Sequence, residues 1–214
     1  MPYLPILVFL FLMLPLFGAM FFTNLVTLSF AKLGLTPGGA FALVLLSLVG
    51  SALNLPLSRR RVWLPERSWS PFPFVFYEPP RLQEQVLYIN VGGAVIPGLF
   101  AAYLLLHTPP GPALLATALV ALVCYRLARI IPGRGIGMPA FLPPLLAALV
   151  ALLLAPPGYE PRVAYISGVY GTLIGADLLH LVQLQRFPAQ AISIGGAGVF
   201  DGIFLVGIVA ALIS

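Results

Sequence analysis

Charged side chains are scarce in this chain. Only 8% of its 214 residues are Asp, Glu, Lys or Arg, whereas soluble domains contain about 25%. Hydrophobic residues make up 60% of the chain and its mean hydropathy is +1.04, so it lacks the polar residues that would cover a water-facing globule. The same composition excludes a disordered chain and a collagen-like repeat. We therefore expect a multi-pass integral membrane protein.

Cysteine is almost absent, since Cys124 is the only one. A single thiol excludes an intrachain disulfide and any multi-cysteine metal site. The net charge of +5 comes from basic residues in short segments between apolar runs, which is typical of topology signals and not of a nucleic-acid surface. The N-terminus has no basic segment before its apolar run, so we expect a retained first helix and not a signal peptide.

Seven apolar stretches approach the ~20 residues that a membrane-spanning helix needs. They predict an all-α bundle of seven transmembrane helices in one domain, residues 1–214. The predicted spans are Tyr3–Phe30, Pro37–Leu57, Gln85–Leu106, Pro112–Ile131, Pro139–Ala155, Arg162–Leu184 and Gln190–Ile213.

One connection, residues 58–84, is longer than the others. It contains five arginines and an aromatic run from Trp69 to Tyr77, with prolines that prevent a regular helix. Aromatic residues gather at the headgroup level of a bilayer. We expect this segment to be a cytoplasmic interfacial loop, acting either as a simple anchor or as a gate beside a site.

The basic residues also predict an orientation. Of the 11 basic residues, only Lys32 and Arg162 fall on one predicted side, and the rest fall on the other. Basic connections stay in the cytoplasm. The pattern predicts a cytoplasmic membrane protein with its N-terminus inside and its C-terminus outside.

The chain has only two aspartates, Asp177 and Asp201, and both fall inside predicted spans. A charged carboxylate at the bilayer centre costs ~2.5–3.5 kcal/mol on insertion scales, so such residues are functional candidates. Asp177 lies 11 residues before Pro188 and Asp201 lies 13 after it. In an antiparallel helical hairpin that turns at Pro188, the two carboxyl groups would lie at similar depth.

Glycines flank both aspartates. Gly171 and Gly175 precede Asp177, and Gly198 and Gly202 flank Asp201. Such small-residue pairs let helices pack closely, so they indicate either ordinary helix packing or an open space beside the carboxyl groups for water or a substrate backbone.

Two carboxyl groups close together in a low dielectric cannot both ionise readily, so the stable form would share one proton. One group can then accept a proton from water while the other protonates an amide carbonyl oxygen. The same shared proton would serve a proton relay in a transporter.

These two aspartates resemble those of the intramembrane aspartyl proteases, the group of presenilin, signal peptide peptidase and prepilin peptidase. The resemblance maps one catalytic role to Asp177, in Gly175-Ala176-Asp177, and the other to Asp201, in Gly-Val-Phe-Asp-Gly. Ala176 stands where that group has tyrosine. The strings Gly-x-Asp-Leu-Leu and Gly-Val-Phe-Asp-Gly-Ile-Phe-Leu also resemble a family of uncharacterised prokaryotic membrane proteins (domain of unknown function 1614), which implies no activity.

Two further residues belong to the candidate site. His180 follows Asp177 by three residues and shares its helical face, so it is expected to bond Asp177 or face the headgroups. Tyr170 lies two turns before Asp177 and is a candidate to bond the carboxyl, line a pocket or pack in the core. Asp177, His180 and Asp201 together would suit a metal, but we expect no metal and no cofactor.

The sequence therefore predicts an intramembrane aspartyl protease-like hydrolase of transmembrane or membrane-proximal peptides. Its catalytic residues would be Asp177 and Asp201, supported by Gly175, Gly198, Gly202, Tyr170 and His180. The expected partners are that peptide and the lipid bilayer, with no nucleic acid. Two alternatives stay open: a transporter or channel with the aspartates as a proton or cation site, and a non-catalytic membrane scaffold.

Overall fold

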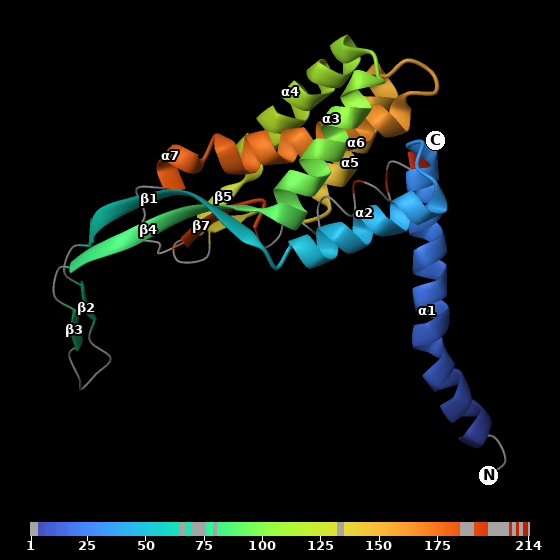
Figure 1. Ribbon diagram of the computed structural model, residues 1–214, viewed down its shortest axis with the longest axis horizontal. Coiled ribbons are helices and arrows are strands. Elements are labelled where there is room, and N and C mark those ends of the chain that lie inside the picture. Colours follow the sequence, from blue (N-terminus) through green and yellow to red (C-terminus); the bar gives the residue numbers. More distant parts are fainter. Residues whose placement is uncertain are drawn as a thin grey trace.

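The computed structural model shows a mostly helical protein with small sheets (Figure 1). It describes residues 4–64, 67–69, 76–78, 81–131, 135–184 and 191–196, and the single residues 206, 209, 212 and 213. The helices are α1 (Leu4–Lys32), α2 (Pro37–Gly50), α3 (Ile96–Leu106), α4 (Pro110–Leu127), α5 (Leu142–Leu154), α6 (Glu160–Thr172) and α7 (Leu181–Leu184), with π-helical turns η1 (Val91–Val95) and η2 (Leu173–Leu178). The strands are β1 (Asn54–Leu64), β2 (Arg67–Trp69), β3 (Phe76–Glu78), β4 (Arg81–Asn90), β5 (Arg129–Ile131), β6 (Gly135–Gly137) and β7 (Ala191–Ile194).

Helices α3 to α6 form a packed bundle, with α6 lying against the other three. Small residues line the buried side of α4 and α5, among them Ala113, Ala116, Ala147 and Ala151. Because these side chains are short, the helix axes approach closely, as is common where small residues line helix interfaces. Larger apolar side chains, such as Leu149 and Leu153 of α5, point outward and are exposed.

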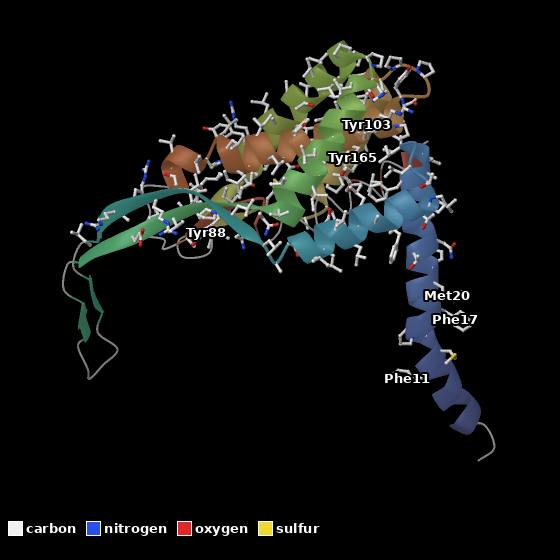
Figure 2. All side chains as sticks on the ribbon, viewed as in Figure 1. Phe11, Phe17, Met20, Tyr88, Tyr103 and Tyr165 are labelled. Carbon is white, nitrogen blue, oxygen red and sulfur yellow. The ribbon has the colours of Figure 1, made fainter. Side chains whose placement is uncertain are left out.

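An aromatic cluster joins the end of α1 to this bundle. The Tyr165 ring lies 5.1 Å from the Phe100 ring and 6.2 Å from the Phe30 ring, both in edge-to-face arrangements that aromatic pairs favour. Tyr165 is among the largest fully buried side chains. In Figure 2 the labelled Tyr165 lies inside the bundle, whereas Phe11, Phe17 and Met20 project from the free part of α1.

Helices α1 and α2 meet at a sharp bend of 109° between Lys32 and Pro37. Gly34 has φ +91 at this bend, in the left-handed region that glycine enters without steric cost. The Thr36 side chain then caps α2 by accepting from the Gly39 backbone N–H at 3.2 Å, and Pro37 occupies the first turn, where its missing N–H costs nothing.

The longest strands form a ribbon that leaves the helical bundle (Figure 1). β1 pairs antiparallel with β4, with Asn54 opposite Asn90 and Leu64 opposite Arg81. β7 adds to the other edge of β4 in parallel, which gives the order β1-β4-β7. β2–β3 and β5–β6 are separate antiparallel pairs.

The prediction of seven membrane spans is wrong. Two helices are long and apolar enough to cross a membrane, Pro110–Leu127 and Glu160–Leu184, and the bent pair Thr23–Lys32 and Pro37–Gly50 makes a third if it counts as one span. These are counts over the part of the chain that the structure describes. Val91–Leu106 and Leu142–Leu154 are shorter apolar helices.

The correction has a physical cause, because apolar length does not fix backbone conformation. The predicted span Gln85–Leu106 begins as strand β4, and Gln190–Ile213 begins as strand β7. Pro37–Leu57 passes from α2 into β1, and α5 begins only at Leu142 within Pro139–Ala155. Likewise, the long interfacial loop expected over residues 58–84 contains paired strands.

Candidate functional site

Asp177 lies in the C-terminal third of the candidate span Glu160–Leu184, in η2. Its side chain is buried, and its Oδ2 accepts a hydrogen bond from the Gly195 backbone N–H at 2.7 Å. A buried hydrogen bond is electrostatically stronger than one in water, because the surroundings have a low dielectric constant. The carboxyl group therefore ties the helix to a segment 18 residues further along the chain.

The helix is widened where it carries this carboxyl group. η2 continues α6 as a π-helical turn, and the Leu179 N–H reaches back five residues to the Ile174 carbonyl at 2.9 Å. Single π-helical turns are rare and occur frequently at functional sites. Sequence reasoning missed this turn, for which residue pattern gives no specific signal.

The Gly195 turn fits closely between η2 and η1. Gly195 has φ +65, and a Cβ atom placed on it would lie 2.6 Å from Ala94 Cβ. Its carbonyl oxygen also occupies the space where a Cβ on Gly93, in η1, would lie. A larger residue at either position would push η1 away from the turn that Asp177 binds.

Asn90 organises the polar junction under this turn. Its Nδ2 donates to the Ser51 carbonyl at 2.7 Å and to Asn54 Oδ1 at 3.2 Å, while its Oδ1 accepts from the Gly93 N–H at 2.7 Å. Ser193 Oγ donates to Asn54 Oδ1 at 2.8 Å. The sequence gives no local signal for the pairing of Asn54 with Asn90 across β1 and β4.

The predicted supporting residues have other partners. His180 is buried, its Nδ1 lies 3.1 Å from the Gly175 carbonyl oxygen, and its ring lies 4.8 Å from the Tyr125 ring. The Tyr170 hydroxyl donates to the Gly98 carbonyl in α3 at 2.8 Å. In the described contacts neither side chain bonds Asp177, since Tyr170 joins α6 to α3 and His180 packs against Tyr125 of α4.

Gly171 and Gly175 pack against α4. A Cβ on Gly171 would lie 2.6 Å from Val120 Cγ1, and one on Gly175 would overlap the Ala121 carbonyl. Of the two meanings left open for these glycines, the structure shows close helix packing, since α4 fills the space beside them.

Asp201, Gly198 and Gly202 lie outside the described residues, so the predicted aspartate pair stays a prediction. The expected hairpin placed Asp177 and Asp201 at similar depth by assuming a second helix from Gln190. The first part of that helix is wrong, because residues 191–194 form strand β7. Further along the chain, the buried Val206 lies against the helix again, since a Cβ on Gly168 would be 2.7 Å from both of its methyl groups.

Among the described residues, no three His, Cys, Asp or Glu side chains come together as a metal site. Asp177 and His180 are both buried near the same turn, but the third predicted ligand, Asp201, is outside the described part. The expectation of no metal and no cofactor stays a prediction.

Fold and site together define a class: a mostly helical protein with two to three helices able to span a membrane and a buried carboxyl group within one of them. Residues 48–213 match the family described as protein of unknown function (DUF1614), and the chain belongs to this family. No curated protein and no solved structure matches the chain. The resemblance to intramembrane aspartyl proteases receives no support from these comparisons.

Proposed function

We propose that this protein is a membrane-embedded hydrolase that uses Asp177 and Asp201 as a pair of acids to cleave transmembrane or membrane-proximal peptides. The observation that carries the proposal is the buried Asp177 carboxyl, located in a π-helical turn of a helix long enough to span a membrane. Ionisable groups in such helices usually serve a function.

A membrane location is supported by the outer surface of the bundle. Leu114 and Leu122 of α4 are 57% and 52% exposed, and Leu149 and Leu153 of α5 are 56% and 74% exposed. Monomeric soluble proteins rarely expose apolar residues in continuous bands of this kind. Lipid chains would cover these side chains, in agreement with the very low charge of the sequence.

The chain on both sides of Asp201 contacts the helix that carries Asp177. Gly195, six residues before Asp201, binds Asp177, and Val206, five residues after it, packs on Gly168. Both contacts fall on the helix that carries Asp177, one at Asp177 itself and the other at Gly168. The proposal brings Asp201 to this same helix, within reach of Asp177.

The proposed chemistry needs only the two carboxyl groups and water. The ionised carboxyl takes a proton from water as the water oxygen bonds to the peptide carbon, and the protonated carboxyl gives its proton to the carbonyl oxygen. The resulting diol collapses as the C–N bond breaks and the nitrogen takes up a proton. The products are a carboxylic acid and an amine.

The test uses the purified full-length protein in nanodiscs with a fluorogenic transmembrane peptide. Asp177→Asn and Asp201→Asn are each expected to lower cleavage at least ~100-fold, the lower end of the range for acid–base catalysis. Glu160→Gln, at the start of the same helix, serves as the control and should keep wild-type cleavage. Cleavage that survives both aspartate substitutions would exclude this hydrolase.

The Asp177–Gly195 hydrogen bond also favours a second function, a non-catalytic membrane scaffold in which Asp177 only fastens the Gly195 turn. Asparagine retains an oxygen that can accept the Gly195 N–H, so a scaffold should tolerate Asp177→Asn. The transporter alternative predicts proton-coupled solute flux in liposomes that Asp177→Asn abolishes. Asp177→Asn thus separates the three functions: a hydrolase loses cleavage, a transporter loses solute flux, and a scaffold is unaffected.

A further inference from the structure

The β1–β4 ribbon has two different faces. Side chains alternate between faces along a strand, and opposite partners share a face, so Gln85, Leu87 and Ile89 lie on one side of β4. Gln85 is 2% exposed, and Leu87 and Ile89 pack against the hydrophobic core. This side is the inner face of the ribbon, which holds it to the bundle.

The outer face, defined by Arg59, Arg61, Leu82, Glu84 and Tyr88, is open. Arg59 lies opposite Val86 and Arg61 opposite Glu84, which places both arginines on the face of Glu84. Leu82 on this face is 62% exposed. Figure 2 labels Tyr88 on β4, at the part of the ribbon nearest the bundle.

The outer face has an excess of positive charge. Among its described side chains, one ion pair joins Arg59 Nη1 to Glu84 Oε1 at 3.9 Å, with both side chains more than half exposed. Such an exposed ion pair contributes little to the free energy of folding. Within the described residues, Arg60 and Arg61 have no carboxylate at ion-pair distance. Arg59 and Arg61 thus accompany one glutamate, Glu84, on the outer face, while Arg60, opposite Gln85, lies on the inner face.

The ribbon also begins at the ends of apolar helices. β1 starts four residues after the bent helix pair ends at Gly50, and β4 continues directly into η1 and α3. A segment attached there emerges where a membrane-spanning helix would leave the hydrocarbon. Basic residues near such helix ends are attracted to anionic lipids by ~1 kcal/mol each.

We propose that the outer face of the β1–β4 ribbon binds the headgroups of anionic phospholipids through Arg59 and Arg61, while Leu82 and Tyr88 enter the interface. The mixture of exposed arginines, an exposed leucine and a half-buried tyrosine matches a surface that meets phosphate and the upper acyl chains together. This binding site is independent of the proposed hydrolysis at Asp177.

The test places a bimane probe on Leu82→Cys in the full-length protein, in nanodiscs of phosphatidylcholine alone or mixed with phosphatidylglycerol. Cys124 is buried, so the protein without the new cysteine should not react and provides the background. We expect a blue shift, and quenching by spin-labelled lipid, only in the anionic nanodiscs. High salt should reverse both effects, because it screens exposed charges.

Arg59→Gln combined with Arg61→Gln should lower the ratio of lipid-bound to water-exposed ribbon by about 30-fold, which corresponds to ~1 kcal/mol for each arginine. The matched control is Arg126→Gln with Arg129→Gln, two exposed arginines elsewhere in the chain, which should keep the wild-type shift. Equal emission in both lipid mixtures would overturn the proposal, as would a shift that survives loss of Arg59 and Arg61. A shift caused by soluble RNA or an acidic peptide but not by anionic lipid would also overturn it.

Discussion

Asp177 connects two parts of the chain through one hydrogen bond to the Gly195 backbone. The bond is buried, so removing the acceptor would leave a backbone N–H that water reaches poorly. An unsatisfied buried group costs ~1–3 kcal/mol. The carboxyl group therefore has a structural effect whether or not it takes part in chemistry, and experiments must separate the two.

The first prediction compares two substitutions at this residue. Asp177→Ala should lower the free energy of unfolding by ~1–3 kcal/mol, because the Gly195 N–H loses its acceptor. Asp177→Asn should cost less, since its amide oxygen takes the same position. Denaturant unfolding in detergent measures both, and equal destabilisation by the two variants would contradict the hydrogen bond described above.

The second prediction concerns the contact between α6 and α4. Gly175→Ala should destabilise the protein by ~1–3 kcal/mol, the usual cost of inserting atoms into a packed interior, because its Cβ would overlap the Ala121 carbonyl. Gly111→Ala in α4 is the control, since no atom lies within 4 Å of a Cβ there. A stability equal to wild type in Gly175→Ala would show that the helices are further apart.

Asn90 joins three elements of the fold. Its side chain contacts the end of α2, strand β1 and the first turn of η1. The side chain also caps η1, since its Oδ1 accepts from the Gly93 N–H. Loss of a helix-capping asparagine costs ~0.5–2 kcal/mol. The junction beneath the Gly195 turn thus depends on one residue.

The third prediction follows from these contacts. Asn90→Ala should cost ~2–3 kcal/mol, as it removes the cap and leaves the Ser51 carbonyl without this donor. Hydrogen exchange should also rise in β4 and η1, which the side chain links. Asn24→Ala is the control, because Asn24 is exposed and bonds only the Met20 carbonyl of its own helix in the described contacts. Equal effects from the two substitutions would contradict this role.

The elements also show what could be predicted from sequence. The helices around Val120 and Tyr165 were predicted because their apolar runs approach the ~20 residues that a membrane-spanning helix needs. The ribbon was missed because its pairing joins residues as far apart as Leu64 and Arg81, and Asn54 and Asn90, and such contacts leave no local pattern. β7 was missed for the same reason, since parallel pairing with β4 depends on distant sequence.

The candidate site was predictable only in part. The scarcity of acids identified Asp177 as a residue of interest, and the structure places it, buried, in the span Glu160–Leu184. Its partner Gly195 was not predicted, because a backbone N–H has no sequence signature. The glycines before Asp177 were ambiguous from sequence, and only the position of α4 shows what fills the space beside them.

At the scale of the whole molecule, the two ends of the helical bundle differ in charge. The Arg162 guanidinium donates to the His107 carbonyl at 3.1 Å, so the connections α3–α4 and α5–α6 lie at one end, where Lys32 also ends α1. Arg126 and Arg129 lie at the far end of α4. The ribbon that carries Arg59 to Arg61 lies at this second, more basic end. Its strand β4 pairs with β7, and β7 contacts η2, which continues α6 at that end.

The last prediction tests orientation in the membrane. Since basic segments remain in the cytoplasm, the end with the ribbon should be inside and the α5–α6 connection outside. Pro157→Cys, in that connection, should react with a membrane-impermeant maleimide in intact spheroplasts. Ser58→Cys, in β1, should react only after permeabilisation. Both positions are exposed and the native Cys124 is buried, so labelling reports the side of the membrane. Reaction of Ser58→Cys in intact cells would contradict this orientation, and with it a cytoplasmic location for the lipid-binding face of the ribbon.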